Sequence, residues 1–147
     1  MSVKFFNLKD GLLRETSSNK YPLFHFIKAG FPSPADDYLE SKLSLDELII
    51  KNPPSTFFVR VEGFSMIDSG IYPNDILVVD KSLTAQINDV IVALLDGEFI
   101  VKRFIRVNGK YFLKSENKGF QNIPIDAHSD FIVWGVVTYV IHKPIVL

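Results

Sequence analysis

The sequence contains no cysteine, which excludes disulfide bonds, cysteine nucleophiles and thiolate metal sites. It also lacks an excess of basic residues, because 16 Lys and Arg are balanced by 17 Asp and Glu, giving a net charge of −1. Dedicated DNA-binding domains usually carry a clear positive surplus. We therefore expect no direct sequence-specific DNA binding, and we expect the partners to be proteins.

Long apolar runs are also missing. The densest apolar segment, residues 131–141, is far shorter than the roughly 20 residues that a membrane-spanning helix needs. Residues 1–10 lack the continuous apolar stretch of a signal peptide. We expect a cytoplasmic protein without a membrane anchor, and the absence of cysteine fits a reducing compartment.

Motifs for cofactors and metals are absent as well. The sequence has no Walker loop, no GxGxxG motif and no metal-spaced cluster of His and acidic residues, so we expect neither cofactor nor metal. Three scattered histidines, for which we expect structural roles, are His25, His128 and His142.

The composition that remains is that of a globular domain, with 147 residues of which 47% are hydrophobic. Residues 1–56 are irregular and rich in proline, and residues 1–28 show no regular period, as expected of an arm. Two short helices are predicted after it. One begins at Ser33-Pro34-Ala35-Asp36 and continues to Leu43, and the other begins at the capping box Ser44-Leu45-Asp46-Glu47.

Residues 57–143 read as short strands separated by turns. The clearest signal is a β-hairpin in which 90–95 and 98–104 flank the type I′ turn Asp96-Gly97. Further strands are predicted at 57–61, 76–80, 111–113 and 131–141, the last bent at Gly135, with a second hairpin turn at 107–110. The fold class is therefore mostly β, a compact folded antiparallel sheet or barrel with one or two short helices.

Lys102 lies in the middle of one predicted strand. Because strand side chains alternate, it shares a face with Ile100 and Phe104, whereas Arg103 points to the opposite face. Burial between two apolar neighbours disfavours the ammonium and lowers the pKa of a lysine, which can then act as a general base. The alternative is a lysine that extends its amine from a half-buried face into water.

Ser65 follows a predicted strand, two residues after Gly63, which permits an unusual backbone conformation. A serine in such a turn can direct its hydroxyl and nearby backbone N–H groups, here those of Ser65 and Met66, to one point. That arrangement suits an acyl-transfer nucleophile and its oxyanion donors. Serines are common in turns, however, and a purely structural role is the alternative.

Several ordered motifs together resemble the LexA/UmuD family of self-cleaving proteins, and the resemblance covers roughly residues 21–143. Ser65 and Lys102 are separated by 37 residues, the interval typical of that family. The motifs that carry the resemblance are Gly63-Phe64-Ser65-Met66, Pro73 to Asp80, Asp96 to Arg103, Leu113-Lys114-Ser115-Glu116-Asn117 and Val133 to Val137.

The resemblance implies a LexA C-terminal-domain fold and a serine peptidase with Ser65 as nucleophile and Lys102 as general base. It also implies that Ala29-Gly30, within Lys28 to Pro34, is the bond that the protein cuts in itself. The expected parts are an arm at 1–29, a linker at 30–56 and a peptidase domain at 57–147. Residue 29 is alanine, as in LexA, where the UmuD branch has cysteine.

Within the family, the sequence most resembles the UmuD branch, and this resemblance implies which partners the protein has. Cleavage would be stimulated by the RecA filament on single-stranded DNA in the SOS response to DNA damage. The trimmed homodimer would then act as accessory subunit of an error-prone polymerase of the UmuC type. Residues 1–20 match no pattern of the family.

Three other functions can be compared with the sequence pattern. A LexA-like repressor would need a helix-turn-helix domain, for which residues 1–28 are too few. A non-enzymatic protein-binding β module would carry the serine and lysine by coincidence. A membrane signal peptidase has a similar serine–lysine pair but requires a membrane anchor.

Overall fold

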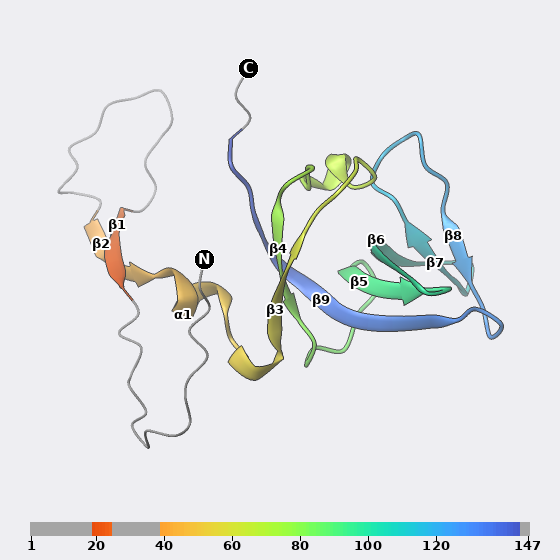
Figure 1. Cartoon of the computed structure of the whole chain (residues 1–147), viewed down its shortest axis with the longest axis horizontal. Coiled ribbons are helices and arrows are strands. Elements are labelled where there is room, and N and C mark those ends of the chain that lie inside the picture. Colours follow the sequence, from red (N-terminus) through yellow and green to blue (C-terminus); the bar gives the residue numbers. More distant parts are fainter. Residues whose placement is uncertain (1–18, 25–38, 145–147) are drawn as a thin grey trace. The chain divides into compact units, whose positions relative to one another are not determined.

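The computed structural model describes residues 19–24 and 39–144, which divide into two units between Leu48 and Ile49 (Figure 1). The first unit contains an antiparallel pair, β1 (Lys20–Phe24) and β2 (Leu39–Ser44). Our prediction of a helix running to Leu43 is therefore wrong for residues 39–43, and the part of it before residue 39 lies outside the described residues. The sequence also did not predict strand β1, which lies in the segment that was expected to be an irregular arm. Pairing between segments that are distant in the sequence satisfies the backbone groups on the facing edges of the two strands, and a local period along the sequence cannot reveal it.

Helix α1 (Leu45–Ile49) begins where the capping box predicts. The backbone N–H of Glu47 donates to the Ser44 hydroxyl at 3.3 Å, which confirms Ser44 as the N-cap. Within the described ranges, no helix is long and apolar enough to cross a bilayer.

The second unit is a seven-stranded antiparallel sheet in the order β3-β4-β9-β5-β6-β7-β8. Every strand predicted from the sequence is present, and of the two expected forms the open folded sheet is observed, with β3 and β8 at its edges. β8, which contains Pro124, was not predicted. The strands are β3 (Thr56–Arg60), β4 (Ile76–Asp80), β5 (Val90–Leu95), β6 (Glu98–Val107), β7 (Lys110–Lys114), β8 (Ile123–Ile125) and β9 (Phe131–Ile141).

The turn at Asp96-Gly97 has the predicted type I′ geometry, and the second predicted hairpin turn has the same geometry. Asp96 and Gly97 have φ of 49° and 83°, and Asn108 and Gly109 have φ of 50° and 77°. Two successive residues with positive φ define the type I′ turn, whose twist matches that of the flanking strands. The turn at 96–97 therefore fixes the register in which Ile91 lies opposite Lys102.

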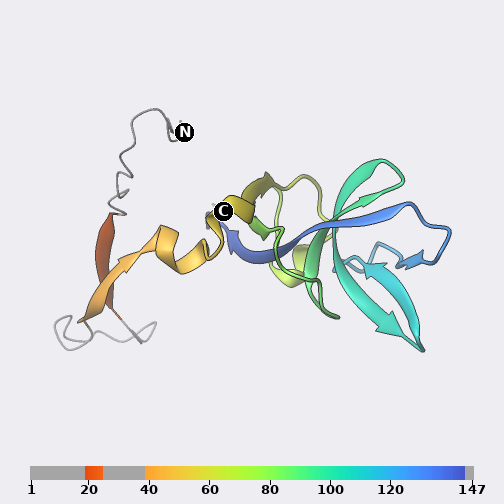
Figure 2. The same ribbon diagram turned by 90° about the horizontal axis from the view of Figure 1, so that it is seen from below.

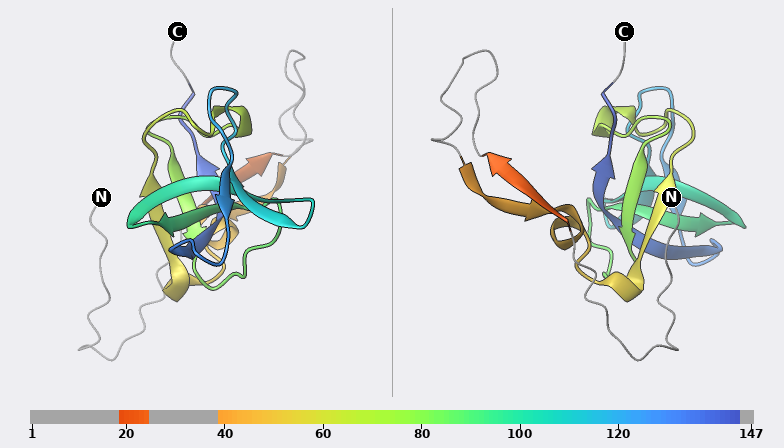
Figure 3. Two further views of the ribbon diagram at one scale, coloured as in Figure 1. Left: turned by 90° about the vertical axis from the view of Figure 1, so that its right-hand side faces the viewer. Right: turned by 60° about the vertical axis from the view of Figure 1, so that its left-hand side comes forward.

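Strand β9 connects the two halves of the sheet (Figures 2 and 3). It pairs with β5 through residues 131–136 and with β4 through residues 136–141, and a register shift lies next to Gly135. A Cβ atom on Gly135 would lie 2.6 Å from Val79 Cγ1 and 3.2 Å from the carbonyl oxygen of Asp80. Glycine is required here because two strands approach closely.

Strand β5 is buried on both faces and separates two apolar clusters. Val92 belongs to a cluster with Met66, Leu77 and Val79. Ile91 and Ala93 belong to a second cluster, against which Ile100 and Phe104 pack. Because Met66 belongs to the first cluster, the core also anchors the loop that carries Ser65.

Candidate active site

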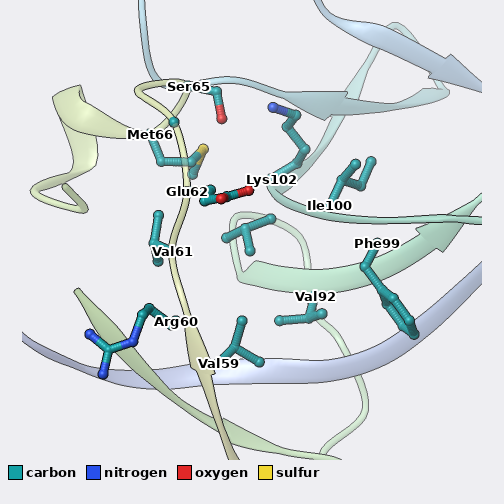
Figure 4. Close-up of a pocket in the computed structure, with 12 residues that line it drawn as sticks. Val59, Arg60, Val61, Glu62, Ser65, Met66, Val92, Phe99, Ile100 and Lys102 are labelled. Atoms are coloured by element: carbon teal, nitrogen blue, oxygen red, sulfur yellow. The ribbon is translucent and has the colours of Figure 1, made fainter. Parts of the chain in front are cut away.

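Ser65 and Lys102 lie in the wall of the same cavity, which has a volume of about 320 Å³. The cavity lies between the segment 59–66 and the strands β5 and β6, and its lining includes apolar residues such as Val92 and Ile100 as well as the charged Arg60 and Glu62. Figure 4 shows the Ser65 hydroxyl and the Lys102 amine pointing toward one another from different elements. The structure thus brings together the two residues that the sequence singled out.

Ser65 lies on a tight loop between β3 and β4. Gly63, at φ of 80°, turns the chain out of β3, and residues 67–69 form a single 3₁₀ turn after the serine. Met66 is 2% exposed and belongs to the core, whereas Ser65 itself is half-buried and reaches the cavity. The loop therefore has a buried anchor directly beside a reactive hydroxyl.

Two hydrogen bonds attach this loop to the segment after β7. Asn117 Nδ2 donates to the carbonyl of Phe64 at 2.7 Å, and the N–H of Asp68 donates to the carbonyl of Glu116 at 2.7 Å. The loop is thus held on both sides of Ser65. Within the described part of the chain, the N–H groups of Ser65 and Met66 donate to no protein acceptor, so both could donate to a substrate oxygen.

Lys102 lies at the middle of β6, opposite Ile91, and its same-face neighbours Ile100 and Phe104 pack against the second apolar cluster. Its Nζ atom lies 5.6 Å from the centre of the Phe120 ring. Among the residues that the structure describes, Lys102 forms no ion pair. Burial lowers the pKa of the Lys102 amine, because the cavity disfavours the ammonium.

Sequence reasoning did not assign a role to Arg103 or Glu116. Arg103 Nε donates to the Glu116 carboxylate, and its other nitrogens reach Ser69 Oγ at 3.1 Å and the carbonyl of Asn88 at 2.6 Å. Partial burial acts to raise the pKa of Glu116, but the hydrogen bond from Arg103 and the charge of Lys114 outweigh it and lower that pKa. Arg103 thus ties the strand of Lys102 to the loop of Ser65. The motif Leu113 to Asn117 carried the family resemblance, yet it gave no indication of this contact.

Ala29 and Gly30 lie outside the described residues. Among those that are described, no group of three or more His, Asp or Glu side chains could hold a metal ion. Asp96 and Glu98 lie at the β5–β6 hairpin, as the sequence predicts.

Comparisons with known proteins assign the chain to a family. Residues 22–138 match the family described as peptidase S24-like. Protein MucA of Salmonella typhimurium is 42% identical over 123 residues, which cover 82% of this chain and 84% of MucA. Protein ImpA of Escherichia coli is 40% identical over 83% of each chain, and the LexA repressor of Proteus mirabilis is 37% identical over 90% of this chain and 65% of the repressor. The chain therefore belongs to the peptidase S24-like family, as a UmuD-like, self-cleaving serine–lysine peptidase.

Proposed function

We propose that this peptidase cuts its own backbone once, between Ala29 and Gly30, with Ser65 as nucleophile and Lys102 as general base. The observation that carries the proposal is that both side chains line one cavity in which burial lowers the pKa of the lysine amine. A neutral amine near a hydroxyl can accept its proton, whereas an ammonium cannot.

The reaction begins when the neutral Lys102 Nζ takes the proton of Ser65 Oγ as this oxygen bonds to the carbonyl carbon of Ala29. The negative charge that develops on the carbonyl oxygen is stabilised by the N–H groups of Ser65 and Met66, each such donor contributing roughly 3–4 kcal/mol. The Lys102 ammonium then protonates the nitrogen of Gly30 as the carbon–nitrogen bond breaks. Water hydrolyses the ester on Ser65, giving residues 1–29 and 30–147 as products.

The residues around the bond suit such a site. Ala29 and Gly30 are small, so the backbone can approach a narrow cavity, and glycine tolerates strained dihedral angles. Pro32 and Pro34 favour an extended chain after the bond. The reaction would remove the arm (1–29) and leave the linker (30–56) attached to the peptidase domain (57–147).

A tethered substrate gives a high effective concentration, so cleavage is controlled by how often the arm docks. We propose that the RecA filament on single-stranded DNA favours docking during the SOS response in the cytoplasm. The trimmed product would form a homodimer and serve a UmuC-type error-prone polymerase as accessory subunit. The resemblance to the UmuD branch and the similarity to MucA and ImpA support this assignment.

Mass spectrometry of the purified chain tests the proposal. Incubation at alkaline pH, or with activated RecA at neutral pH, should produce a fragment that begins at Gly30. Ser65→Ala and Lys102→Ala should each abolish this fragment, whereas Lys110→Ala, at an exposed strand end, should not. A fragment that forms equally in the Ser65→Ala chain would refute the proposal. A gel shift with duplex DNA would instead support a function like that of the LexA repressor.

A further inference from the structure

The peptide group between Phe64 and Ser65 has no side-chain anchor of its own. Phe64 is 62% exposed, and the preceding residue, Gly63, has no side chain. On the other side of Ser65, by contrast, Met66 is 2% exposed and fixed in the core. Hydrogen bonds to the Phe64 carbonyl are therefore the direct contacts that hold this peptide group.

Asn117 supplies the shorter of the two hydrogen bonds to this group. Its Nδ2 donates to the Phe64 carbonyl at 2.7 Å, compared with 3.4 Å for the N–H of Ile67. A trans peptide group is planar, and its C=O and N–H point in opposite directions. A side chain that holds the Phe64 carbonyl therefore also fixes the direction of the Ser65 N–H.

Asn117 is itself held in place by the short turn that it begins. Its Oδ1 accepts from the N–H of Gly119 at 3.2 Å, and its carbonyl accepts from the N–H of Phe120 at 3.1 Å. The residue before it, Glu116, holds the N–H of Asp68 on the far side of the serine. The amide of Asn117 thus reaches Phe64 from a fixed position.

We propose that Asn117 is a positioning residue for the oxyanion site of the self-cleavage reaction. It acts through the 64–65 peptide group and aims the Ser65 N–H at the oxygen of the scissile carbonyl. This inference rests on the proposed function, because it needs Ser65 as nucleophile and its N–H as donor.

The pH profile separates this role from a general effect on the loop. Phe120 lies in the same turn and covers the Lys102 amine, so a displaced turn would change the environment of the base and shift the inflection of the profile. A misdirected Ser65 N–H instead lowers the rate at the alkaline plateau, where the lysine is already neutral, and leaves the inflection where it was.

The experiment measures self-cleavage of the full chain against pH for the wild type and for Asn117→Ala, Asn117→Asp and Asn117→Gln. Asn117→Asp keeps the acceptor for Gly119 but loses the donor to Phe64. We expect Asn117→Ala and Asn117→Asp to lower the plateau rate about 10- to 100-fold. Asn117→Gln, which keeps a donor, should recover part of that loss, and the inflection of Asn117→Ala should match the wild type.

A wild-type plateau in Asn117→Asp would overturn the inference, as would a loss in Asn117→Ala that appears as a shifted inflection with a normal plateau. Melting curves identify any variant that does not fold. If Asn117→Ala does not fold, Asn117→Asp still tests the inference, because its carboxylate keeps the acceptor for the N–H of Gly119. A wild-type chain that does not cut, or a Ser65→Ala chain that cuts as fast, would overturn the proposed function itself. Cleavage that depends on Ser65 but not on the Asn117 amide would overturn this inference alone.

Discussion

The protonation of Lys102 gives the sharpest prediction about rate. If the neutral amine is the base, the rate of self-cleavage follows the fraction of Lys102 that has lost its proton. Below the pKa this fraction rises tenfold for each pH unit. An unburied lysine has a pKa of 10.5 and is neutral in about one molecule per thousand at pH 7.5. Because burial in the cavity lowers the pKa of Lys102, the neutral fraction at that pH must be larger.

The assay is the first-order rate of appearance of the 30–147 fragment between pH 6 and 11, in the absence of RecA. The logarithm of the rate should rise with a slope of one and then level off, with an inflection below 10.5. Lys102→Arg should be inactive at every pH, because arginine keeps its proton throughout this range. The melting temperature, followed over the same pH values, identifies any loss of folded protein.

Two results would refute this reasoning. A rate that is constant at every pH would show that no lysine deprotonation limits the reaction. A rate that still rises tenfold per unit through pH 10.5 would show that the cavity does not favour the neutral amine.

Three further predictions concern stability. Gly135→Ala should lower the free energy of unfolding in urea by about 1–3 kcal/mol, because its Cβ would overlap the neighbouring strand. The control variant Gly119→Ala should change this free energy little. Equal urea midpoints for the two variants would contradict the packing argument. Arg103→Met should cost about 1–3 kcal/mol at pH 7, because it leaves the carboxylate of Glu116 without its main partner. Folding lowers the pKa of Glu116, so the stabilisation from its carboxylate is present above the unfolded-state pKa of 4.5 and is lost as the pH falls. The difference in the free energy of unfolding between wild type and Arg103→Met should therefore shrink in acid. A difference that stays constant with pH would argue against the ion pair. Lys102→Met should abolish cleavage yet raise the melting temperature at pH 7. The reason is that the lowered pKa of Lys102 means that folding disfavours its ammonium. A lower melting temperature for this variant would contradict the argument.

All strands of the second unit except β8, and both of its hairpin turns, could be predicted because their signals are local. Asp96-Gly97 and Asn108-Gly109 are sequences that favour positive φ, and both form the expected turns. Alternation along β6 also placed Lys102 correctly beside Ile100 and Phe104. Strands β1 and β2 could not be predicted in this way, because each depends on a partner that is distant in the sequence.

The same distinction between local and long-range signals applies to the candidate site. Ser65 and Lys102 could be found from a turn, an alternating strand and their spacing. The contacts of Asn117 with Phe64 and of Arg103 with Glu116 join residues that are 53 and 13 positions apart, and no local pattern indicates them. A half-buried asparagine and a paired arginine have many ordinary roles, so the fold is needed to show which groups they contact.

The arrangement of the site is compatible with a peptidase that cuts itself. The cavity is lined by apolar residues and by the charged Arg60, Glu62 and Lys102, and burial there lowers the pKa of Lys102 and favours its neutral form. A segment of the same molecule needs little binding energy, because the tether already supplies a high effective concentration. The serine loop is held at Phe64, Met66 and Asp68, so the catalytic groups are already placed before docking. If Ser65 and Lys102 are the catalytic pair, as proposed, control of the reaction acts on the docking of the arm rather than on the pair itself.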